Sequence, residues 1–245
     1  MQLQLQQVRL TAPVGMGQVF NNLSLSIDVG DRLAILGAAN SGKTALLRLL
    51  NRLTSPQSGQ IQFEGRDLAE WPVNILRRQI AYVDQTPRLL GLTVGETLRY
   101  PLAIQKPALS DPELRLKTLI DAVNLPATWL DQPGTQLSIS QQQFVAIARA
   151  LILQPKVLLL DAPLATLAPA QLRKILAGVN YITPKTTVVI TSRESEGVAE
   201  FCNRYLLLDE GGIIQAGKMT ESDRDGLKQL IDQIARRDDQ DWQSE

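Results

Sequence analysis

The residues Gly37-Ala38-Ala39-Asn40-Ser41-Gly42-Lys43-Thr44 form a complete G-x-x-x-x-G-K-T sequence, the pattern of a phosphate-binding loop. An apolar run (33–36) precedes them, and leucines at helical spacing (46–53) follow. We therefore predict a strand, a glycine-rich loop and a helix in succession, which is the context that the motif requires. The alternative is a glycine-rich turn without a ligand, and the four fixed positions of the motif argue against a chance match.

Each part of this loop has a chemical role toward a nucleotide. Backbone N–H groups can point at phosphate oxygens, and the positive N-terminal end of the following helix adds to the attraction. The Lys43 ammonium is expected to reach the β- and γ-phosphates, and the Thr44 hydroxyl is expected to ligate Mg²⁺. The loop therefore predicts nucleotide binding, and the fate of the nucleotide depends on residues elsewhere.

Composition restricts the remaining chemistry. The 245 residues include no histidine, which excludes a histidine base, metal ligand or proton shuttle. Lys+Arg and Asp+Glu both number 25, so charge gives no support for a nucleic-acid partner. The only cysteine, Cys202, cannot form an internal disulfide and is expected to fill space as a small apolar side chain.

No apolar run approaches the roughly 18 residues of a membrane span, and the N-terminus does not resemble a signal peptide. We therefore expect the chain to be cytoplasmic and soluble, reaching a membrane only through a partner. With 44% hydrophobic and 20% charged residues, it has the composition of one sizeable α/β domain or two small ones.

Apolar alternation and apolar runs predict strands at residues 3–5, 23–29, 60–63, 80–83, 157–160, 187–190, 204–208 and 212–216. The last two of these strands are expected to form a hairpin that closes the fold. Turn signals lie at Pro13, Gly15 and Gly17.

Between these strands the sequence changes character. Residues from about 87 to 153 are expected to be helical, with Asp111 opening one helix and Ser140 capping another. A helix around residues 171–181 lies between two buried strands, and this βαβ alternation predicts a parallel core sheet. The tail from Glu221 is expected to form a polar helix.

Three further motifs follow the phosphate loop in order. Tyr82-Val83-Asp84-Gln85 ends one strand, Leu137-Ser138-Ile139-Ser140-Gln141 precedes a helix, and Asp161 ends another strand. These pieces, in this order, resemble the ATP-binding subunit of an ABC transporter over nearly the whole chain.

The resemblance implies an α/β fold of the P-loop NTPase (RecA-like) kind. It has a parallel core sheet, an N-terminal antiparallel β subdomain and a helical insert subdomain. On this reading the core covers about 1–86 and 154–219, the helical subdomain about 87–153, and a C-terminal polar helix about 220–245.

The resemblance also implies roles for individual residues. Residues 37–44, Gln85 and Asp161 would bind ATP and Mg²⁺, with Thr44, Gln85 and Asp161 as the metal ligands. For Gln85, a plain surface amide remains the alternative. The family's signature segment, which contacts ATP held by a second subunit, corresponds here to Ser138, Ile139, Ser140 and Gln141.

Several positions depart from the family's pattern. The glutamate that polarises the attacking water is Ala162, the switch histidine is Ser192, and the D-loop aspartate is Ala168. General-base assistance contributes roughly 10²–10⁴-fold in rate, or about 3–5 kcal/mol. No catalytic side chain is therefore intact, and we expect hydrolysis to be weak or absent.

Contacts to the nucleotide are also altered. Ile139 and Ser140 replace the two signature glycines that allow close backbone approach to a phosphate, so a weakened contact is expected. An adenine-stacking aromatic, expected near residues 10–13, is missing from the sequence there. Phe20 is nearby, and we expect it to belong to the core.

The resemblance implies transmembrane permease subunits as partners, a homodimer or a heterodimer with another ATP-binding subunit, and a place on the inner face of the membrane. A non-hydrolysing regulatory or assembly module is the alternative function. A third possibility is a soluble family member in translation or DNA repair, which would usually carry two such domains or a long insertion. The sequence identifies neither the transported substrate nor the direction of transport.

Overall fold

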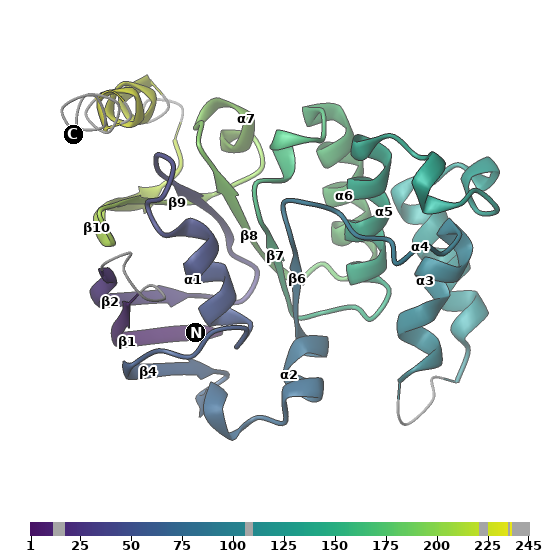
Figure 1. Cartoon of the computed structure of the whole chain (residues 1–245), viewed down its shortest axis with the longest axis horizontal. Helices are drawn as coiled ribbons and strands as arrows, with labels where there is room; N and C mark the ends of the chain where they lie inside the picture. The colour runs from purple at the N-terminus through teal and green to yellow at the C-terminus, as the bar shows by residue number, and fades with distance from the viewer. Residues whose placement is uncertain (12–17, 106–109, 221–224, 235, 237–245) are drawn as a thin grey trace. The chain divides into compact units, whose positions relative to one another are not determined.

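A computed structural model describes residues 1–11, 18–105, 110–220, 225–234 and 236 (Figure 1). The turn signals at Pro13, Gly15 and Gly17, and much of the tail beyond residue 220, lie outside this range. The fold divides into two compact units, one comprising Met1–Arg77 and Thr187–Glu245 and the other comprising Arg78–Thr186.

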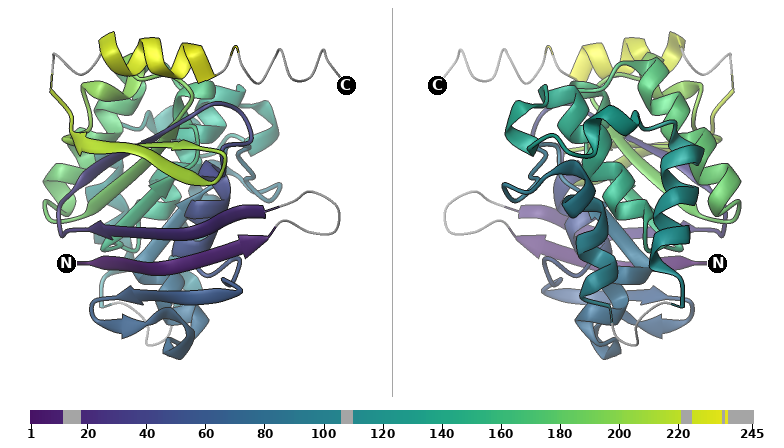
Figure 2. Two further views of the ribbon diagram at one scale, coloured as in Figure 1. Left: turned by 90° about the vertical axis from the view of Figure 1, so that its left-hand side faces the viewer. Right: turned by 90° about the vertical axis from the view of Figure 1, so that its right-hand side faces the viewer.

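The first unit contains an antiparallel sheet with the strand order β2-β1-β4-β5. The strands are β1 (Leu3–Thr11), β2 (Gln18–Ile27), β4 (Ser58–Phe63) and β5 (Arg66–Asp67). Figure 2 shows β1 and β2 side by side. Leu3 and Leu5 face the core, and Gln7, at φ 50°, lies in a register shift after which Val8 resumes the buried face.

A second group of strands in this unit is centred on β3 (Arg32–Leu36). It runs parallel to both β8 (Thr187–Ser192) and β9 (Arg204–Asp209), and β10 (Gly212–Lys218) pairs with β9 antiparallel. All residues of β3 after Arg32 are buried, as expected for a parallel strand covered on both faces. The parallel pairing and the closing hairpin predicted from the sequence are both confirmed.

The phosphate loop lies between β3 and α1 (Lys43–Leu50), which confirms the predicted succession of strand, loop and helix. The other short elements of this unit are η1 (Leu68–Glu70), α2 (Val73–Gln79) and α7 (Glu196–Ala199). The last two residues of α2 belong to the second unit.

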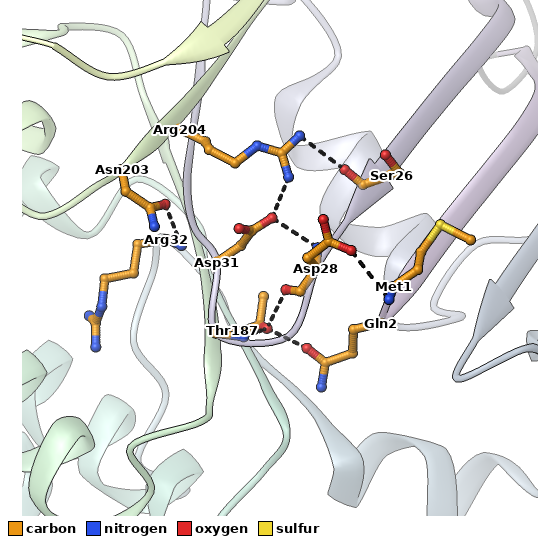
Figure 3. A network of polar contacts seen from close by, with 10 residues as sticks. Met1, Gln2, Ser26, Asp28, Asp31, Arg32, Thr187, Asn203 and Arg204 are labelled. Carbon is orange, nitrogen blue, oxygen red and sulfur yellow. Dashed lines mark hydrogen bonds and ion pairs between the residues drawn. The ribbon is translucent and has the colours of Figure 1, made fainter.

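Polar contacts fix the turn that leads into β3 (Figure 3). The Thr187 hydroxyl accepts a hydrogen bond from the Gly30 N–H at 2.9 Å and donates to the Asp28 carbonyl at 3.0 Å. Asp31 pairs with Arg204 at the start of β9 and also accepts from the Asp28 N–H at 2.8 Å. These contacts join the turn to the first residues of β8 and β9, the two strands that flank β3.

The second unit pairs β6 (Ile80–Val83) with β7 (Val157–Leu160) in parallel. Its helices are α3 (Val94–Ala103), α4 (Pro112–Val123), α5 (Ile139–Leu151) and α6 (Pro169–Ile182), with the 3-10 turns η2 (Ala127–Trp129), η3 (Gly134–Gln136) and η4 (Pro163–Ala165). Helix α5 packs against α3 and α6 and against both strands, and Figure 1 shows these helices together. As predicted, Asp111 caps α4, and its side chain accepts from the Leu114 N–H at 3.1 Å.

The first unit also contains two buried features of the C-terminal part. Cys202 is buried, as expected, and burial raises the pKa of its thiol to about 12. Residues 225–234 are helical, and the apolar side chains of this helix are buried at Leu227, Ile231 and Ile234. The helix is therefore amphipathic, whereas the sequence had indicated a polar one.

Candidate functional site

The phosphate loop begins with a glycine that has no room for a side chain. Gly37 has φ 151°, and a Cβ at this position would lie 2.4 Å from the Leu208 carbonyl oxygen and 2.5 Å from Ser41 Oγ. The loop backbone therefore turns directly against β9. Any larger residue would have to displace the backbone of that strand.

The loop ends at a second glycine with a different restriction. Gly42 has φ 94°, and a Cβ there would lie 2.9 Å from two ring atoms of Phe20. Phe20 is fully buried in β2, which confirms its predicted place in the core. Its ring also supports the end of the loop, and this role was not predicted from the sequence because the contact joins residues far apart in the chain.

Lys43 holds the loop together from within. Its ammonium donates to the Gly37 carbonyl at 2.9 Å, to the Ala38 carbonyl and to Ser41 Oγ at 2.9 Å. The remaining loop residues, Ala39 and Asn40, are exposed. These contacts keep a cation at the loop, where phosphate oxygens can take the place of its protein acceptors.

The N-terminus of α1 is open to an anion. Gly42 occupies the N-cap without a side-chain hydrogen bond, and the first turn contains no acidic residue. Thr44 is partly exposed, and its hydroxyl has no hydrogen-bond partner among the described residues. The N–H groups and the Thr44 oxygen fit a phosphate with its Mg²⁺.

Ser192 lies beside this loop. In the parallel pairing of β3 with β8 it is opposite Leu36, the residue before Gly37. Ser192 is only 8% exposed, and its oxygen accepts from the Glu194 N–H at 3.1 Å. The residue in the switch position therefore stabilises the turn after β8.

Asp161 follows the buried strand β7 in the second unit and is 3% exposed. Its N–H donates to the Val83 carbonyl at 3.0 Å, and its Oδ2 accepts from the Tyr82 hydroxyl at 3.0 Å. Such an outer hydrogen bond orients a carboxylate that binds a metal ion. The role of Tyr82 was not predicted, although the expected pairing of two parallel strands could have indicated it.

Ala162 adopts the left-handed conformation, with φ 42° and ψ 52°, and is the N-cap residue of the turn η4. This conformation is uncommon for residues other than glycine, asparagine and aspartate. The side chain is a methyl group, so the residue after Asp161 supplies no proton acceptor.

The segment after β6 carries Gln85, whose side chain is exposed. The preceding residue is fixed by Gln143 of α5, which donates from Nε2 to the Asp84 carbonyl at 3.1 Å. Gln143 is fully buried, and its Oε1 has no partner among the residues that the structure describes. Gln143 was not singled out in the sequence, where three adjacent glutamines gave no sign of which one is buried.

The N-cap of α5 is Ser138, and the prediction that Ser140 caps this helix was wrong. Ser138 is extended, and its oxygen accepts from the Gln141 N–H at 3.3 Å, while its own N–H donates to Gln141 Oε1 at 2.8 Å. This capping box requires an extended residue three positions before Gln141, which excludes Ser140. Ile139 occupies the first helical position with its side chain 63% exposed.

Among the residues that the structure describes, no cluster of side chains could bind a metal ion without another ligand. No group of three or more His, Cys, Asp or Glu side chains could hold an ion there. Mg²⁺ typically binds through one or two carboxylates together with substrate phosphates. Thr44 in the first unit and Asp161 in the second each carry an oxygen of the kind that Mg²⁺ prefers.

A β-strand followed by this loop and an uncapped helix defines a P-loop nucleotide-binding domain. The ABC transporter family model matches residues 20–165, and the chain belongs to this family. In the described part of the chain, no helix is both long and apolar enough to cross a membrane.

Curated relatives agree with this assignment. The methionine import ATP-binding protein MetN of Caulobacter vibrioides is 34% identical, over 88% of this chain and 67% of its own. The probable sulfate/thiosulfate import ATP-binding protein CysA of Chlorella vulgaris is 37% identical, over 84% of this chain and 88% of its own. The chain spans 63% of the length of several other MetN relatives.

Solved structures agree as well. CbiO1 of Clostridium perfringens, part of an ABC transporter complex, has a TM-score of 0.78 at 26% identity, with 90% of this chain and 89% of that one covered. A dimeric ATP-binding cassette in a post-hydrolysis state with ADP and Pi has a TM-score of 0.79 at 26% identity, with 89% and 99% covered. The predicted fold class is confirmed.

Proposed function

We propose that this chain is the ATP-binding subunit of an ABC importer and that it binds ATP with Mg²⁺ but hydrolyses it slowly or not at all. The observation that carries the proposal is the combination of a complete phosphate loop with a methyl group at Ala162. The loop supports binding because its glycines, its lysine and its open helix N-terminus are all in place.

Weak hydrolysis follows from what the side chains can do. Ala162 cannot accept a proton from water, and the oxygen of Ser192 is engaged in a turn. Loss of general-base assistance costs roughly 10²–10⁴-fold in rate, and a serine supplies no positive charge toward a γ-phosphate. In the family's pattern, Mg²⁺ would be held by Thr44, Gln85 and Asp161 and would neutralise phosphate charge when bound.

Pairing with a second subunit changes this expectation only in part. In the family's head-to-tail dimer, a homodimer would lack the glutamate and the histidine at both sites. A heterodimer with a regular subunit would bring a regular signature to this chain's loop, but this chain would still lack its own catalytic residues. The partner's ATP would face the exposed side chain of Ile139.

Transport is proposed from relatives named for import, MetN and CysA. Membrane permease subunits would then be the partners, and the chain would lie on the cytoplasmic face of the membrane. A regulatory module that uses nucleotide only to set its conformation is the second candidate, supported by the same missing carboxylate.

The test has two parts. Binding of ATP to the purified chain should require Mg²⁺ and Lys43, and turnover should stay low. Co-purification with a multi-span membrane protein would support the transport role. Stable ATP binding without any membrane partner would favour the regulatory module, and fast turnover lost in Lys43→Ala would overturn weak hydrolysis.

A further inference from the structure

One amide oxygen joins the first turns of α5 and α6. Gln171 is the third residue of α6, and its Oε1 accepts from the N–H of Ala168, the N-cap residue, at 3.0 Å. The same oxygen accepts from the Ser140 hydroxyl, in the first turn of α5, at 2.8 Å. Both helices belong to the second unit.

Gln171 makes the half of a capping box that does not depend on the side chain of Ala168. An N-cap residue with an oxygen side chain would accept a bond from the first turn, and a methyl group cannot. The helix retains the other half of a capping box, in which the third residue reaches back to the N-cap N–H. Gln171 therefore fixes the end of the loop after Asp161, where the family's aspartate is missing.

The bond to Ser140 determines what the signature segment (residues 138–141) can offer. A hydroxyl has one proton, and that of Ser140 is donated to Gln171, so it is not available to a phosphate. The Ser138 oxygen accepts the Gln141 N–H, and its proton has no acceptor among the described residues. Of the two serines, Ser138 is the donor that remains.

We propose that Gln171 is a positioning residue that couples the signature segment to Ala168, so that both surfaces meet a partner subunit's nucleotide as one piece. This inference rests on the proposed function, because a nucleotide held by a second subunit is what the signature segment would contact. It adds a residue that couples the signature segment to the N-cap of α6.

The coupling can be measured in the full-length chain without nucleotide, by NMR-detected hydrogen exchange. In Gln171→Leu the Ala168 amide loses its acceptor directly. We expect the Gln141 and Gln142 amides of α5 to exchange about 3–10-fold faster as well, the equivalent of one net hydrogen bond. Ser140→Ala should in turn speed exchange at Ala168.

Three further variants make the measurement specific. Gln171→Glu keeps acceptor oxygens and should restore near-wild-type exchange. Lys174→Leu, at an exposed position on α6, should change neither segment. The double variant of Ser140→Ala and Gln171→Leu should match the larger single effect, since both changes break one connection.

The proposal is overturned if Gln171→Leu leaves Gln141 and Gln142 at wild-type rates, or if the two single effects add. If Gln171→Leu fails to fold, Ser140→Ala with exchange read at Ala168 decides the matter alone. Titration with a fluorescent ATP analogue should give wild-type affinity for each folded variant. Loss of ATP binding in the wild type would contradict the proposed function and leave the exchange result standing.

Discussion

The phosphate loop and the segment from Asp161 to Ala168 differ in what holds them. The loop depends on backbone geometry, in which Gly37 and Gly42 fit against Leu208 and Phe20 with no space for a Cβ. The second segment retains Asp161 but carries methyl groups at Ala162 and Ala168, where the family's pattern has carboxylates. The determinants of binding in the loop are therefore tied to the fold through its backbone, whereas hydrolysis depends on which side chains the second segment carries.

The largest expected effect is on nucleotide affinity. Lys43→Ala removes the cation from the loop, and hydrogen bonds to charged groups contribute about 1.5–3 kcal/mol, so we expect affinity for ATP–Mg²⁺ to fall roughly 10–100-fold. Isothermal titration calorimetry measures this change. Lys185→Ala, at an exposed position in the second unit, is the control. An equal loss of ATP affinity in both variants would show that Lys43 is not part of the binding site.

The close packing of the loop predicts a difference between two glycines. Gly42→Ala would place a Cβ 2.9 Å from the Phe20 ring, whereas Gly65, at φ 78°, has nothing within 4 Å of such a Cβ. Both alanines incur the left-handed strain of about 1–2 kcal/mol, and only Gly42→Ala adds overpacking of about 1–3 kcal/mol. Denaturant unfolding should show the larger loss for Gly42→Ala. Similar losses would mean that Phe20 does not restrict the loop.

A carboxylate can be returned to the second segment. Ala162→Glu should raise single-turnover hydrolysis about 10-fold, less than the roughly 10²–10⁴-fold typical of a base because Ser192 is unchanged. Ala162→Gln has the same size but accepts no proton, so it is the matched control. If the two variants hydrolyse ATP at one rate, the missing carboxylate is not what limits turnover.

The smallest effect concerns two helix caps in the second unit. The box that caps α3 pairs Thr93 with Glu96, and the backbone hydrogen bond from Thr93 lowers the pKa of Glu96. Because the pKa of Glu96 is lower in the folded chain, ionised Glu96 stabilises the fold at pH values above its unfolded pKa of about 4.3. This stabilisation is lost as the pH falls through the folded pKa. The box of α5, Ser138 with Gln141, contains no ionisable group.

Backbone NMR shifts can be followed at Glu96 of α3 and Gln141 of α5 from about pH 6 to about pH 3. As the pH is lowered, the Glu96 shift should therefore change at a higher pH than the Gln141 shift. Glu96→Gln should remove the difference. Simultaneous movement at both caps, or movement at Gln141 first, would contradict this assignment.

Sequence patterns predicted the features that depend on local spacing. The apolar runs gave β3 and β7, and the glycine motif gave the loop, because buried parallel strands and left-handed turns restrict residue type locally. The sequence predicts the N-cap of α5 at Ser140 and not at Ser138, because two serines two positions apart look alike until backbone dihedral angles are known.

Contacts between distant residues could not be predicted in this way. Phe20 beneath Gly42, Tyr82 on Asp161 and Gln171 on Ser140 each join separate elements, and none changes the local pattern. Their positions follow from strand pairing and helix packing, which the sequence defines only through the complete fold.

The most direct measurement of the central proposal is single-turnover hydrolysis by the purified full-length chain. The reaction contains Mg²⁺, and the ATP concentration is kept below the protein concentration. We predict that the wild type binds ATP and leaves it largely intact over a time in which a typical enzyme, at roughly 10 s⁻¹, would complete many turnovers. Lys43→Ala should bind ATP roughly 10–100-fold more weakly. Rapid conversion of bound ATP to ADP by the wild type, abolished in Lys43→Ala, would show that this chain hydrolyses ATP without a glutamate after Asp161.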